Sequence, residues 1–147
     1  MPPTQLNSEV EVDAPVAHVY RVLTDFERYH EWNPFITSIS GKLAEGETLE
    51  VALSLPEGKD YVLRPRLTRV RADAELRWRG HFLHSALLAG EHFFQLSARG
   101  ETKTRFVQGE IFSGLLLRFQ GATLTRSLRG FVYMNQALKR RAESTFR

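Results

Sequence analysis

The chain has 147 residues, of which 42% are hydrophobic and 25% charged, with a net charge of +3 and no cysteine. This size and composition predict one folded domain with its own core and argue against disorder, while the lack of cysteine excludes disulfides, thiolate metal sites and a cysteine nucleophile. Because acidic residues are interspersed with basic ones through most of the chain, we expect a solvated surface and no nucleic-acid binding.

The beginning of the chain carries no signal for export. Residues 1–5 lack the basic and apolar regions of a signal peptide. No apolar run approaches the roughly 20 residues that span a membrane. We therefore expect a soluble, cytoplasmic protein with no stable membrane insertion. We see no linker, repeat or second domain, so residues 1–147 are read as a single domain of undetermined oligomeric state.

The first elements are predicted to be a strand followed by two short helices. Residues 6–12 alternate between apolar and polar side chains, the pattern of a half-buried strand. Asp13 is a good helix N-cap and Pro15 suits a first helical turn, after which apolar residues recur at helical spacing as far as Leu23. A second short helix is predicted at residues 26–30.

The middle of the chain is predicted to form antiparallel hairpins. The turn at residues 56–60 pairs Leu55 with Tyr61 and begins a strand that runs on through Leu67. The next turn, near residues 71–74, pairs Leu67 with Trp78. We expect the face of the sheet on which each side chain lies to be fixed, because a slip of one residue would turn every side chain to the wrong side.

The last two predicted strands bring polar side chains to the inner face. Beyond a loop at residues 83–89, Trp78 is predicted to lie opposite Phe94, and Gly80 opposite His92. The turn at residues 99–103 then pairs His92 with Glu110.

A long amphipathic helix is predicted from about residue 123 to the end of the chain. Its apolar stripe consists of Leu124, Leu128, Phe131, Val132, Leu138 and Ala142. Asn135 lies on or beside this stripe. A helix of this kind after a sheet with one apolar face predicts an α+β fold in which the sheet packs on the helix.

The inward-facing residues are the candidate site because they mix aromatic and polar side chains. A carboxylate facing a dry core costs several kcal/mol unless it is paired or protonated, so Glu110 favours a cavity with water or a ligand. Gly80 beside His92 leaves room for one. Two other arrangements stay open: Glu110 and His92 satisfy each other as a buried pair, or Glu110 lies at a rim in water.

Other kinds of site are not indicated. No spacing of histidines and carboxylates resembles a metal site, no glycine-rich phosphate loop is present and no serine has a nucleophile context. We therefore predict no metal and no cofactor. An outer arginine stripe could meet a protein partner or a membrane surface, but a solvated sheet face is the expected interpretation, the residues being Arg64, Arg66, Arg77 and Arg79.

The order of several segments resembles the START-related helix-grip (SRPBCC) superfamily, specifically its polyketide cyclase/dehydrase and lipid-transport group. The resemblance rests on Asp13-Ala14-Pro15, residues 24–34, Gly90-Glu91-His92-Phe93-Phe94, residues 104–114 and the long final helix. It implies a seven-stranded antiparallel sheet wrapped around the C-terminal helix, with two short helices after the first strand and a cavity between sheet and helix. Gly90-Glu91-His92 is similar to the segment that forms a latch loop in the plant hormone receptors of the superfamily.

Two functions follow from this site as hypotheses. The first is binding or carriage of a small hydrophobic molecule, lipid-like or aromatic, in the cavity. The second is a cyclase or dehydratase acting on a polyketide-like substrate, with His92 or Glu110 moving a proton. The residues expected to line the cavity are Trp78, Phe82, His92, Phe94, Gln108, Glu110, Phe112, Leu128, Phe131 and Asn135.

Overall fold

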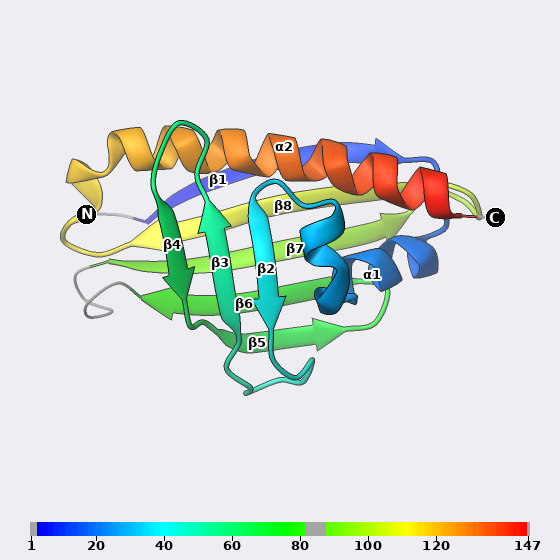
Figure 1. Ribbon diagram of the computed structural model, residues 1–147, viewed down its shortest axis with the longest axis horizontal. Helices are drawn as coiled ribbons and strands as arrows, with labels where there is room; N and C mark the ends of the chain where they lie inside the picture. Colours follow the sequence, from blue (N-terminus) through cyan, green and yellow to red (C-terminus); the bar gives the residue numbers. More distant parts are fainter. Residues whose placement is uncertain (1–2, 82–87, 147) are drawn as a thin grey trace.

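The computed structural model describes residues 3–81 and 88–146, and these residues form an α+β fold (Figure 1). In chain order the elements are β1 Thr4–Val12, α1 Val16–Thr24, the 3₁₀ helix η1 Phe26–Glu31, β2 Ile36–Ser40, β3 Glu50–Ser54, β4 Asp60–Leu63, β5 Arg66–Arg71, β6 Glu75–His81, β7 Ala89–Ala98, β8 Thr104–Ser113, the 3₁₀ helix η2 Leu117–Phe119 and α2 Gly121–Thr145.

The strands of the described residues form two antiparallel sheets instead of the single seven-stranded sheet that the resemblance implied. The larger has the order β1-β8-β7-β6-β5 and the smaller β2-β3-β4, with one bridge between Thr48 and Arg66. The prediction of one strand through residues 61–67 was wrong. Pro65 has no backbone N–H to donate, and the chain leaves β4 in the small sheet and enters β5 in the large one.

The predicted strand registers are confirmed in two hairpins and wrong in two. Leu67 pairs with Trp78, and His92 pairs with Glu110, as predicted. Tyr61 pairs with Leu53 instead of Leu55, and Trp78 pairs with His92 instead of Phe94. Both errors are slips of two residues, which keep every side chain on its face and leave the alternation of the sequence unchanged.

The start of α1 differs from the prediction. Pro15 occupies the N-cap position in an extended conformation, and the helix begins at Val16. Asp13 is therefore not the cap. Its backbone N–H donates to the carboxylate of Glu143 in α2, and its own carboxylate lies 3.3 Å from Nζ of Lys103. Asp13 ties the end of β1 to the end of α2.

Helix α2 runs along the length of the large sheet beside β1 (Figure 1). On the side of the small sheet, α2 packs closely against Phe35, just before β2, because Gly130 has no side chain and a Cβ there would lie 2.3 Å from the Phe35 ring. Val132 was assigned wrongly to the apolar stripe, since it is 40% exposed, and Met134 is fully buried in the core. Among the described helices, none is both long and apolar enough to cross a membrane.

Candidate functional site

Four polar side chains on β7, β8 and α2 form one hydrogen-bonded chain inside the fold. Nδ1 of His92 lies 3.1 Å from a carboxylate oxygen of Glu110, and its Nε2 lies 2.9 Å from the amide oxygen of Gln108. The amide nitrogen of Gln108 donates to the side-chain oxygen of Asn135 at 2.8 Å. The pairing of Glu110 with His92, one of the arrangements that the sequence left open, is therefore present.

The amide of Gln108 determines which nitrogen of His92 carries a hydrogen. Its Nε2 donates to Asn135 and, at 3.4 Å, to the backbone carbonyl of Phe131. Its oxygen therefore faces His92, and an amide oxygen can only accept. In this orientation of the amide, Nε2 of His92 is the donor to Gln108, and Nδ1 faces Glu110.

Aromatic rings hold the imidazole of His92 in place. Trp78 stacks on it with the ring centroids 5.4 Å apart, and Phe94 lies at 4.8 Å. Phe131 of α2 contacts it edge-on at 5.1 Å. Only 4% of His92 is exposed. Because both the rings and the hydrogen bonds fix its orientation, His92 is suited to positioning Glu110.

Glu110 occupies space that a missing side chain leaves beside it. A Cβ on Gly90 would lie 2.1 Å from Oε2 of Glu110, so the carboxylate lies directly over this glycine. Gly80 pairs with Gly90 on the neighbouring strand, and a Cβ there would meet only Pro65, at 3.5 Å. The two glycines lie side by side on β6 and β7, where the Glu110 carboxylate lies over Gly90 and Pro65 lies against Gly80.

Burial decreases along the inner face toward the end where β8 finishes and α2 begins. On β8, Phe106 and Gln108 are fully buried, the side chain of Glu110 is 20% exposed and Phe112 is partly buried. On α2, Met134 and Leu138 are fully buried, whereas Leu124 and Leu128 are partly buried. We call the region around Glu110, Phe112 and Leu128 the open half, and the region around Phe106 and Leu138 the packed half.

The predicted site residues divide between these regions. Glu110, Phe112 and Leu128 lie in the open half. Trp78 and His92 lie between the halves, at 5% and 4% exposure. The other predicted site residues that the structure describes are at most 1% exposed, namely Phe94, Gln108, Phe131 and Asn135. Phe82 lies outside the described residues. Contact of any of them with a ligand remains a prediction.

The sequence-based reasoning missed two features of the site. Gly90 was quoted only as part of a latch-like segment, but Gly90, Glu91 and His92 lie within β7 and pair with strands on both sides, so they do not form a loop. The stacking of Trp78 on His92 was not predicted, because the two-residue register error paired Trp78 with Phe94.

Two hollows in the described surface lie away from the inner face. One lies on the outer side of the large sheet, around Phe93, Arg77 and Arg105. The other lies between α1 and the end of α2, around His18, Trp32 and further residues. Neither is lined by a predicted site residue. The described residues also contain no group of three or more histidines and carboxylates placed to hold a metal ion.

Solved structures share this fold at low sequence identity. The Zhui aromatase/cyclase of a Streptomyces species is 14% identical with a TM-score of 0.82, over 99% of this chain and 97% of that one. A START superfamily protein from Mycobacterium smegmatis is 19% identical with a TM-score of 0.73, over 97% and 99%. A norcoclaurine synthase mutant from Thalictrum flavum, in complex with a transition-state analogue, is 9% identical with a TM-score of 0.72, over 96% and 94%.

Sequence comparison gives the family. No curated protein is significantly similar to the chain. Residues 3–143, nearly its whole length, match the family described as polyketide cyclase/dehydrase and lipid transport. The match agrees with the polyketide cyclase/dehydrase and lipid-transport resemblance seen in the sequence. The chain therefore belongs to the family described as polyketide cyclase/dehydrase and lipid transport.

Proposed function

We propose that the protein binds a small hydrophobic molecule, lipid-like or aromatic and polyketide-like, in the open half of the inner face. The observation that carries this proposal is a partly exposed carboxylate, Glu110, held by a buried histidine among apolar side chains. Apolar walls with a few convergent polar groups are the usual form of a small-molecule site. Membership of a family with lipid-transport members supports the same class of ligand.

The apolar residues supply affinity and Glu110 supplies orientation. Burying about 200 Å² of apolar ligand surface contributes about 5 kcal/mol before the costs of ordering, which suits micromolar binding. As a carboxylate, Glu110 accepts a hydrogen bond from a hydroxyl group of the ligand.

A fluorescence titration with the neutral probe N-phenyl-1-naphthylamine tests this binding. Phe112→Ala and Leu128→Ala should each weaken binding of the probe about fivefold, because each removes roughly 1 kcal/mol of apolar contact. Val132→Ala is the matched control, since Val132 lies on the same helix but is 40% exposed. Failure of the wild-type protein to bind the probe, or equal losses in all three variants, would contradict the proposal.

A cyclase or dehydratase is the second candidate, favoured by the hydrogen bond between Glu110 and His92. In such a reaction, a base takes a proton from a carbon next to a carbonyl group, and the resulting enolate attacks a second carbonyl of the same chain. The new C–C bond forms as the second carbonyl oxygen becomes an alkoxide and takes a proton. Loss of water from this product gives the unsaturated ring. Glu110 as the carboxylate is the base, and His92 positions it.

Two substitutions separate the candidates. In an enzyme, Glu110→Gln and His92→Ala should abolish cyclisation of a synthetic linear poly-β-ketone thioester, measured by mass spectrometry of the products. In a carrier, the same variants should only weaken binding of the probe, and the wild-type protein should leave the thioester unchanged beyond its spontaneous reaction. If neither binding nor turnover changes in the two folded variants, these residues have no part in either function.

A further inference from the structure

The chain has a long segment without any acidic residue. Residues 111–142, from the end of β8 through most of α2, contain six basic side chains and no Asp or Glu. The other residues hold fourteen basic and all seventeen acidic side chains, so they carry a net negative charge. The positive charge of the protein is therefore concentrated on one side of the fold, along α2 and η2.

About half of these basic residues are neutralised by neighbouring carboxylates. Arg129 pairs with Glu57, Lys139 with Glu143, and Arg141 with Glu31. No ion pair within the described ranges involves the other three, Arg118, Arg126 and Arg140. Arg126 still lies close enough to Glu57 to lower the pKa of that carboxyl, together with the hydrogen bond from Arg129 that acts most strongly on it.

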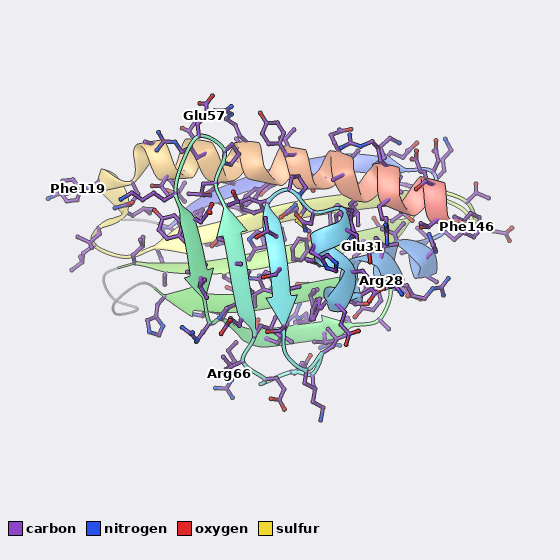
Figure 2. All side chains as sticks on the ribbon, viewed as in Figure 1. Arg28, Glu31, Glu57, Arg66, Phe119 and Phe146 are labelled. Carbon is purple, nitrogen blue, oxygen red and sulfur yellow. The ribbon has the colours of Figure 1, made fainter. Side chains whose placement is uncertain are left out.

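Large apolar side chains protrude at the start of this basic segment. Leu115 is 66% exposed and Phe119 is 68% exposed, the highest fractions among the exposed large hydrophobic residues described. Leu117, between them, is only 2% exposed and anchors η2 to the fold. Gly114 has a positive φ of 117°, a conformation that favours glycine and turns the chain out of β8. Figure 2 shows Phe119 pointing away from the molecule at the end where α2 begins.

Basic and apolar groups are in direct contact in this patch. The guanidinium of Arg118 lies 4.7 Å from the centre of the Phe119 ring. Arg126 follows about one and a half turns into α2, and its stem lies against the turn at Gly58. We call Leu115, Arg118, Phe119 and Arg126 the corner patch. Leu115 comes only three residues after Phe112, so the patch adjoins the open half of the inner face.

We propose that the corner patch docks the protein on the surface of a membrane that contains anionic lipids. Arginine and lysine near such a surface gain roughly 1 kcal/mol each, and protruding Leu and Phe side chains enter the boundary between headgroups and acyl chains. Arginine stems cover apolar surface while their charged ends reach the phosphates. The basic residues of the patch would also attract nucleic acid or an acidic protein. The exposed aliphatic side chain of Leu115 favours the membrane over nucleic acid.

This inference rests on the proposed function, because docking on a membrane serves a protein that binds a hydrophobic ligand. A ligand that enters the open half beside Phe112 would pass between the bilayer and the protein without crossing water. The attachment is peripheral, since it uses side chains at one corner and no spanning segment.

Co-sedimentation with sucrose-loaded vesicles tests the docking. The vesicles contain phosphatidylcholine alone or with roughly 30% phosphatidylglycerol, at about 0.1 M salt and at about 1 M salt. The wild-type protein should sediment with the anionic vesicles at low salt, and binding should fall at high salt. Arg118→Gln with Arg126→Gln should weaken it roughly 25-fold, about fivefold for each charge. Leu115→Ser with Phe119→Ser should weaken it at least roughly tenfold.

Matched controls come from the rest of the surface. Phe146→Ser removes an exposed aromatic ring at the opposite end of α2, and Arg66→Gln removes an exposed charge on β5, both labelled in Figure 2. Both should bind vesicles as the wild-type protein does. Losses in the controls as large as those in the patch variants would overturn the proposal, as would a wild-type protein that does not bind anionic vesicles but binds RNA or DNA.

The same variants keep this test separate from that of the proposed function. Leu115→Ser with Phe119→Ser should bind N-phenyl-1-naphthylamine in solution as tightly as the wild-type protein. Probe binding without vesicle binding by the wild-type protein overturns the docking alone. Vesicle binding that depends on the corner patch, without probe binding, supports the docking and counts against the proposed ligand site.

Discussion

Replacing Gln108 with leucine should destabilise the protein although the substitution keeps a side chain of similar size. Gln108 is fully buried and connects β8 to β7 and to α2. Leucine leaves the Nε2–H of His92 and the side-chain oxygen of Asn135 without partners. A buried polar group without a partner costs about 1–3 kcal/mol, and the gain from burying an apolar group offsets part of this, so we expect a net loss of about 2–4 kcal/mol.

Urea denaturation at neutral pH measures this loss as a change in the unfolding midpoint at constant slope. Gln95→Leu is the matched control, because Gln95 is exposed on β7 and should change stability by less than about 0.5 kcal/mol. In a Gln108→Leu background, Asn135→Leu should cost much less than it does alone, since the two residues share one network. If Gln108→Leu were as stable as Gln95→Leu, the hydrogen-bonded chain would not be intact in solution.

Two further predictions concern the glycine beside Glu110 and an ion pair of α2. Gly90→Ala should cost about 1–3 kcal/mol, because its Cβ would lie 2.1 Å from the Glu110 carboxylate, whereas Gly80→Ala should be tolerated; equal losses in urea denaturation would contradict this geometry. The hydrogen bond from Arg141 lowers the pKa of Glu31 below its ordinary value of 4.5. This pair therefore stabilises the fold above about pH 4.5 and loses its effect as the pH falls through the folded-state pKa. The stability difference between wild-type protein and Arg141→Gln should narrow on acidification; a widening difference would refute the assignment.

The faces of the sheet could be predicted from the sequence, whereas some partners across it could not. The short turn at residues 99–103 joins two strands whose alternation is clear, and this fixed the pair His92 and Glu110 correctly. The connection between β6 and β7 is longer, so its length did not restrict the register, and Trp78 was assigned the wrong partner. The break at Pro65 was missed because residues 61–67 keep one alternation through both strands.

The members of the polar chain were identified, but not how they are bonded. The alternation placed His92, Gln108 and Glu110 on one face, and the helical period placed Asn135 beside them. The pattern does not say how deeply the helix covers each position. Depth depends on close contacts such as that of Gly130 with Phe35, which set how α2 packs against the segment before β2. The difference between the packed and open halves therefore emerges only from the fold.

The most direct test of the account is where an apolar ligand binds. NMR spectra of the side chains, recorded during titration with N-phenyl-1-naphthylamine, report the site residue by residue. We predict saturable shifts at Phe112, Leu128 and Glu110, with Met134 and Leu138 of the packed half unchanged. Shifts confined to the outer hollow around Phe93, or none that saturate, would contradict a binding site on the inner face of the sheet.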